Sequence, residues 1–164
     1  MRKKILLLSL LALTVFSTTL FANHNHSDLK INTEVSSVNW VGKKVTGQHE
    51  GAIKIKEGVL NLHDGHLSGG TIVIDMTSIT CTDLKPDKGA KKLVGHLNSP
   101  DFFDVANHTT ATLKIIGVKM IEGNKHMITG MLTIKGITKA INFTLSELTP
   151  IAMADFVFPP TAKM

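Results

Sequence analysis

Apolar and polar residues alternate along most of the chain with a period of two. Between residues 45 and 55 every second position is apolar, glycine or histidine, and the positions between them are mostly charged or polar. Residues 71–76, 132–135 and 141–145 show largely the same alternation. Such alternation is typical of strands with one buried face and one solvated face. The pattern therefore predicts a chain made mainly of antiparallel strands.

Pairs that contain glycine mark the expected turns. Asp64-Gly65 is a strong signal for a two-residue hairpin, and Glu57-Gly58 and Glu122-Gly123 predict further turns. Gly69-Gly70 indicates a bulge. Strands joined by tight turns favour an up-and-down barrel over a sandwich, because closure removes exposed strand edges. We predict an all-β antiparallel barrel of roughly eight strands, wide enough for side chains or one elongated ligand.

One stretch, residues 89–105, departs from the two-residue period. Its apolar residues have the i, i+3, i+4, i+7 spacing of an amphipathic helix: Ala90, Leu93, Val94 and Leu97. The next residues, 99–101, have the features of a second helix start, with Ser at the cap and Pro at the first helical position. They lead to Phe102 and Phe103. The sequence thus predicts one short helical insertion that covers or fills the barrel.

The N-terminus has the composition of a secretory signal peptide. Three basic residues precede an apolar run over residues 5–16, and small and polar residues follow as far as Ala22. The alternative, a membrane anchor, needs roughly 20 apolar residues, so no permanent anchor is expected after cleavage. We predict a signal peptide over 1–22, a flexible N-terminus over 23–28 and one β-barrel domain over 29–164.

Charge and cysteine content exclude several classes of function. Without Arg2, Lys3 and Lys4, 15 of the 18 basic residues remain against 13 acidic ones, so the net charge falls from +5 to about +2. No arginine follows Arg2, which argues against nucleic-acid recognition. Cys81 is the single cysteine, so no intramolecular disulfide forms and no resolving thiol supports a redox role.

Histidines supply the candidate polar chemistry. Alternation places His49 on the inward face, either as a core histidine bonded to a backbone carbonyl or as a polar group at the barrel mouth. His49 and His96 could converge there and seed a metal-dependent hydrolase site. However, no HxxxH spacing and no catalytic triad order is present. We therefore predict no catalytic residues, no metal ligands and no enzymatic activity.

Four segments, in order, resemble the YceI-like family. They are WVGKKVTGQHEG (40–51), IDMTSI (74–79), HLNSPDFFDV (96–105) and GMLTIKGITK (130–139). The resemblance covers about residues 29–148. It implies a lipocalin-like barrel exported to the periplasm. It also implies a long-chain isoprenoid partner, such as a quinone-type or polyprenyl lipid, with no other cofactor.

The strand and helix patterns identify the side chains that such a lipid would contact. An apolar tail needs long, dry walls, and its burial can supply most of the affinity. In this interpretation the helical insertion is a lid and wall of the barrel. The candidate ligand-binding residues are Trp40, Val45, His49, Ile53, Ile74, Met76, Leu93, Leu97, Phe102, Phe103, Ile134 and Phe143.

Two positions depart from the family pattern. His108-Thr109 stands where the family commonly has an aromatic-proline pair. Residues 152–158 resemble the start of a late strand, and about two further strands of the family pattern are not found after them. We therefore expect an incompletely closed barrel, with lower stability or a homodimer through the open edge as its consequence. The alternative is a shortened family member without ligand function.

Overall fold

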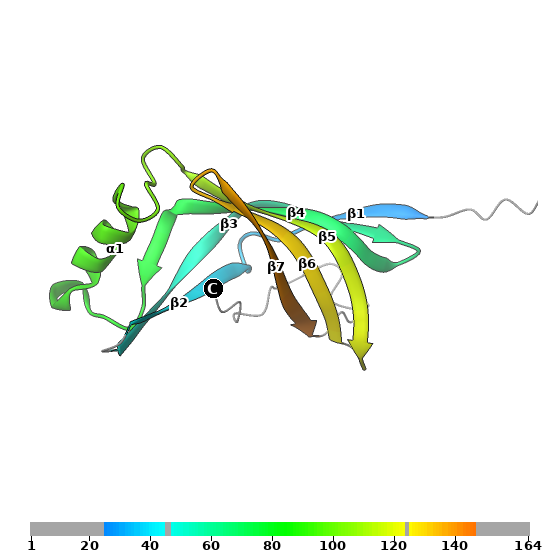
Figure 1. The fold of residues 1–164 in the computed structure, drawn as a ribbon, viewed down its shortest axis with the longest axis horizontal. Helices are drawn as coiled ribbons and strands as arrows, with labels where there is room; N and C mark the ends of the chain where they lie inside the picture. The colour runs from blue at the N-terminus through cyan, green and yellow to red at the C-terminus, as the bar shows by residue number, and fades with distance from the viewer. Residues whose placement is uncertain (1–24, 45–46, 124, 147–164) are drawn as a thin grey trace, which may run out of the picture.

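The computed structural model describes residues 25–44, 47–123 and 125–146 (Figure 1). The predicted signal peptide, Val45 and residues 152–158 lie outside the described residues. Over the described part the chain forms one sheet and one short helical insertion. The elements are β1 (His26–Lys30), β2 (Ser37–Lys44), β3 (Gly47–His63), β4 (His66–Cys81), the 3₁₀ helix η1 (Pro86–Lys88), α1 (Ala90–Asn98), β5 (Thr110–Glu122), β6 (Lys125–Ile134) and β7 (Ile137–Ser146).

All strand pairs are antiparallel, and the sheet runs in the order β1–β3–β4–β5–β6–β7. β2 pairs with residues 47–54 of β3 and β1 with residues 59–63, so β1 and β2 follow each other along one edge of β3. The sheet is strongly curved (Figure 1). Within the described residues it does not close, because β2 and β7 do not pair. The predicted all-β antiparallel fold with a helical insertion is confirmed.

The turns agree with the glycine signals except at one place. Asp64 and Gly65 have φ values of 49° and 78°, as the two-residue hairpin between β3 and β4 requires. Glu122-Gly123 lies at the β5–β6 turn, as predicted. The predicted turn at Glu57-Gly58 is wrong, because β3 continues through it with a bulge after Ile55. A Cβ at Gly58 would lie 2.5 Å from Ile31 Cδ1, so the glycine allows the Ile31 side chain to pack directly against the β3 backbone.

The first strand begins earlier than the sequence indicates. β1 starts at His26, inside the segment expected to be a flexible N-terminus. Its residues pair with the end of β3, and Asn61 Nδ2 donates to Asp28 Oδ1 at 2.8 Å. The edge of β3 therefore orders a stretch whose own composition is polar.

The helix over Ala90–Asn98 is confirmed, but the second helix predicted from Ser99 is not formed. Ser99 instead ends α1: its backbone N–H and its Oγ both donate to the His96 carbonyl, at 3.1 and 2.7 Å. The last carbonyls of a helix have no partner within the helix, and Ser99 satisfies one of them. Residues 100–103 then form turns that bring Phe103 toward the sheet.

The core consists of two neighbouring clusters of buried side chains. One lies along the middle of β3–β6 and includes Leu60, Ile72 and Ile128. The other includes Trp40, Met76 and Leu97 and lies where α1 packs on one end of the sheet (Figure 1). A large hollow lies between these clusters and the edge strands β2 and β7.

Candidate functional site

A cavity of about 1020 Å³ lies inside the curve of the sheet. Its two sides are β2 and β7, the strands that face each other without pairing, and β3–β6 form its wall. Residues 137–146 border it along the length of β7, roughly 30 Å at about 3.3 Å per residue. The lining is Ser37, Val38, Asn39, Ile53, Ile55, Ile72, Ile74, Met76, Phe103, Ala111, Leu113, Leu132, Ile134, Ile137, Lys139, Ile141, Asn142, Phe143, Thr144, Leu145 and Ser146.

Apolar and polar groups are separated within this cavity. Residues from β3, β4, β5 and β6 are all apolar, because only their inward side chains reach it. The polar residues come from the two facing edge strands. Lys139 is the one charged residue of the lining among the described residues. Its position pairs with Leu132, and Leu132 with Leu113, so the lysine ends a row of leucines at the open edge.

Six of the twelve candidate residues line this cavity: Ile53, Ile74, Met76, Phe103, Ile134 and Phe143. Lining residues outside the candidate set include Ala111, Ile137 and Lys139. Lys139 has the same parity as Ile137 and Ile141, so the alternation along β7 could have identified it. On β2, Val38 shares the inward parity of Trp40 and also lines the cavity. Ser37 and Asn39 have no such signal, because their place in the lining depends on how the two ends of the sheet face each other.

Five candidates lie elsewhere, and Val45 is outside the described residues. Trp40 and Leu97 belong to the core cluster beneath α1, and the Trp40 indole N–H donates to the Thr80 carbonyl at 3.1 Å. Phe102 is 46% exposed and packs edge-on against Phe103. The expectation that α1 forms a lid on the cavity is therefore corrected. It covers one end of the sheet, and only Phe103 from the helical insertion reaches the cavity.

His49 and Leu93 border a separate, shallow hollow of about 260 Å³ between β3 and α1, together with His96, Leu84, Gly89 and Lys92. His49 and His96 do come together, as considered from the sequence. His49 is not inside the barrel, however, because its end of β3 extends past the cavity. Its partner is a carboxylate: Nδ1 lies 2.9 Å from Asp83 Oδ2. Among the described residues, no three His, Cys, Asp or Glu side chains are arranged to hold a metal ion.

Comparison with known proteins gives the family. The model of the YceI-like domain matches residues 29–159. The chain belongs to the YceI-like family. The match includes all four motifs and every strand of the sheet from β2 onward. No helix in the described part of this YceI-like chain is long and apolar enough to span a membrane.

Individual relatives share only part of their length or a low sequence identity with the YceI-like chain. A UPF0312 protein of Azotobacter vinelandii (strain DJ / ATCC BAA-1303) is 44% identical over 46 residues, which are 28% of this chain and 24% of the relative. The aligned part thus spans about a quarter of that protein. A crystal structure of a mutant CJ YceI protein with a monobromobimane guest is 17% identical, with 88% of this chain and 59% of that chain covered and a TM-score of 0.42. Burkholderia cenocepacia BcnA is 18% identical, with 76% and 68% covered and a TM-score of 0.41.

Asp83 connects β3 to the segment before α1 in this YceI-like fold. Its carboxylate lies 2.9 Å from His49 Nδ1 and accepts hydrogen bonds from the Glu50 N–H and the Cys81 thiol, both at 3.1 Å. These bonds, the one to His49 first, lower the pKa of Asp83 to about 2. Burial and the hydrogen bond to Asp83 raise the pKa of Cys81. The thiol therefore stays protonated at neutral pH, which makes it a poor nucleophile.

The lowered pKa of Asp83 predicts how stability depends on pH. A carboxyl group whose pKa is depressed on folding stabilises the fold above its ordinary pKa, near 3.8, and loses this contribution as the pH falls toward about 2. We expect Asp83→Asn to remove this part of the acid sensitivity, measured as the midpoint of urea unfolding between pH 5 and pH 2. Asp87→Asn, at an exposed residue of η1, is the matched control. If the urea midpoint falls equally between pH 5 and pH 2 in the wild type and in Asp83→Asn, Asp83 is not a source of the acid sensitivity.

Proposed function

We propose that this protein binds one long-chain isoprenoid or similar lipid in its cavity and carries or stores it in the periplasm. The observation that supports this most directly is the size and chemistry of the cavity. Its volume, about 1020 Å³, lies at the upper end of the roughly 300–1,000 Å³ of typical ligand sites. Its walls are aliphatic over most of their length. A long apolar chain with few hydrogen-bonding groups matches such a space.

The expected affinity comes from burial of the tail. Removing roughly 400 Å² of apolar lipid surface from water supplies about 10 kcal/mol at about 25 cal/mol per Å², before the costs of association. The walls that would provide it are on four neighbouring strands, each of which pairs with another strand on either side. The wall is thus formed before the lipid enters, which limits the entropy lost on binding.

The polar rim suggests an orientation for the lipid. Lys139 has the inward parity of Ile141 and Phe143 on β7, whereas Asn142 accepts a hydrogen bond from Thr129 Oγ1 on the outer face. The outer edges of β7 and β2, which pair with no further described strand, border the open side. A headgroup placed there keeps its hydrogen bonds, whereas the same group against the β3–β6 wall would lose them. We therefore place the headgroup at the rim between β2 and β7 and the tail along the wall.

Mass spectrometry of the full chain, expressed with residues 1–22 in place, tests the proposal. Lipid extraction of the purified protein should yield an isoprenoid or quinone-type lipid, and the intact mass should correspond to a chain that begins at Asn23. A fluorescent isoprenoid analogue should compete with the extracted lipid for a single site. Absence of a co-purifying lipid together with no saturable uptake of the analogue would refute the proposal.

A further inference from the structure

The second half of β5 presents apolar side chains to solvent. β4 pairs with β5 only as far as Ile115, so beyond it β5 pairs with β6 alone within the described residues. This half carries three of the large apolar side chains that are most exposed: Ile116 at 54%, Met120 at 63% and Ile121 at 47%. We call these three residues, with Lys119 and Lys125, the tip patch.

Two bulges limit which partners the tip patch can accept. The pairing of β5 with β6 shifts between Ile115 and Gly117 and again between Met120 and Glu122, so Ile116 and Ile121 are the extra residues. Bulges and an edge lysine disrupt the regular row of backbone groups that another strand needs. Pairing with the edge of a second copy is therefore disfavoured. A fluid apolar phase makes no such demand on the backbone.

The charges around the tip patch indicate the sign of the partner. Lys114, Lys119 and Lys125 are exposed, and Glu122 is the single acidic residue among the described residues from 114 to 125. Exposed apolar side chains flanked by lysines are typical of proteins that bind the surface of an anionic bilayer. Each lysine near such a surface strengthens binding by about fivefold.

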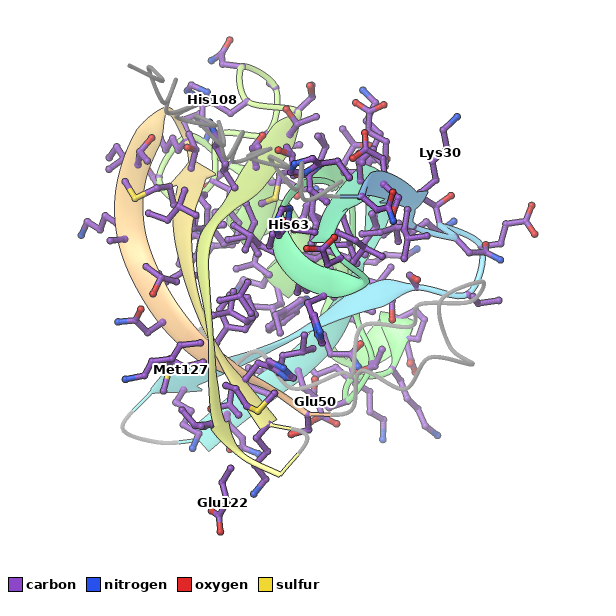
Figure 2. The ribbon with its side chains drawn as sticks, turned by 90° about the vertical axis from the view of Figure 1, so that its right-hand side faces the viewer. Lys30, Glu50, His63, His108, Glu122 and Met127 are labelled. Carbon is purple, nitrogen blue, oxygen red and sulfur yellow. The ribbon has the colours of Figure 1, made fainter. Side chains whose placement is uncertain are left out.

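The tip patch lies beside one end of the cavity. Met120 pairs with His126, and His126 pairs with Leu145, which lines the cavity. Lys125 likewise pairs with Ser146, the last lining residue. Figure 2 shows the β5–β6 hairpin extending from the molecule, with Glu122 at its end. α1 lies away from this end (Figure 1), so it does not obstruct an approach to a flat surface.

From these observations we propose that the tip patch docks on an anionic lipid bilayer. Met120 and Ile121 enter the headgroup region while Lys119 and Lys125 contact the anionic headgroups. Docking by itself does not depend on the function proposed above. Its role in lipid uptake rests on that function, because the docked hairpin places the Leu145–Ser146 end of the cavity at the membrane surface.

Co-sedimentation of the purified full chain with vesicles tests docking. Binding to phosphatidylcholine vesicles that contain phosphatidylglycerol should exceed binding to phosphatidylcholine alone and should weaken with salt. Met120→Ser/Ile121→Ser should lower the partition coefficient by about tenfold or more. Lys119→Glu/Lys125→Glu should lower it by at least about twentyfold. Val35→Ser is the matched control, since Val35 is 54% exposed but lies between β1 and β2.

A second measurement separates docking from ligand binding. The Met120→Ser/Ile121→Ser variant should take up a detergent-solubilised isoprenoid analogue as the wild type does, but should extract it from vesicles about tenfold more slowly. If neither the wild type nor any variant binds the analogue, but the wild type still binds vesicles, the proposed function fails and the docking surface stands. Vesicle binding that is unchanged in both double variants overturns docking. A dimer seen by light scattering and lost in these variants would assign the tip patch to a second copy instead.

Discussion

Replacing Leu132 with tryptophan is expected to weaken isoprenoid binding by tenfold or more while leaving the fold intact. Leu132 lies near the centre of the cavity wall, on β6, between Leu113 on β5 and Lys139 on β7. The larger indole can extend into space that the fold leaves open, so no side chain has to move. It takes the volume that the lipid tail would use.

The size of this effect follows from the tail area that is displaced. Excluding roughly 60–100 Å² of apolar tail at about 25 cal/mol per Å² removes about 1.5–2.5 kcal/mol of binding free energy, or about ten- to seventyfold in Kd. Titration with a fluorescent isoprenoid analogue measures it. The thermal midpoint of the ligand-free protein should change little.

Met131→Trp is the matched control for Leu132→Trp. Met131 is the preceding residue on β6 and points to the opposite face of the sheet, away from the cavity. It should leave the affinity unchanged. Equal affinities of wild type and Leu132→Trp, in proteins that are both folded, would mean that the lipid binds elsewhere.

Gly51→Ala is expected to destabilise the protein by about 3 kcal/mol or more, a large effect for adding one methyl group. A Cβ at Gly51 would lie 1.8 Å from the Thr80 carbonyl oxygen and 2.7 Å from two atoms of the Trp40 ring. The same carbonyl accepts the Trp40 indole hydrogen bond at 3.1 Å. Either the β3–β4 backbone or the buried indole must therefore move.

Urea unfolding followed by Trp40 fluorescence measures this change, since Trp40 is the only tryptophan of the chain. Gly95→Ala is the control, because it should change the stability in the opposite direction. A Cβ at Gly95 meets nothing within 4 Å, and alanine in the helix should stabilise by about 0.5–1 kcal/mol. A Gly51→Ala protein as stable as the wild type would show that the indole does not rest on this glycine.

Periodicity alone was enough to predict the wall of the cavity. Ile53, Ile74 and Ile134 were placed inward by alternation, and each lines the cavity. Local patterns also located α1 and the Asp64-Gly65 hairpin, because helix stripes and turn residues act over a few positions. These predictions need no knowledge of distant contacts.

The incorrect placements all depend on where an element lies along the molecule. His49 shares the inward parity of Ile53, yet it lies beyond the cavity and meets Asp83, which is 34 residues later in the chain. Leu97 has the predicted helical spacing, but its stripe packs in the core beneath α1. Parity fixes the face of a strand. It does not fix which part of that face a cavity occupies.

The bulged residues illustrate the same limit on the outer surface. Neither extra residue is a glycine, and although Gly117 follows Ile116, a single glycine does not show which neighbouring residue is the unpaired one. Both bulges lie in the part of β5 that follows Ile115 and pairs with β6 alone among the described residues. The exposure of these side chains is therefore visible only in the folded sheet.

The strand order has a consequence for the kinetics of folding. Among the described strands, each one from β3 onward pairs with its predecessor in the chain, and only β1 skips a strand. Hairpins such as β3–β4 and β6–β7, each closed by a two-residue turn, can form within microseconds without waiting for distant segments, typically about 1–10 μs each. The longest loop to be closed between paired strands is the one that contains α1. We infer that docking β5 on β4 across this loop is the slow step, so the cavity is the last part of the fold to be completed.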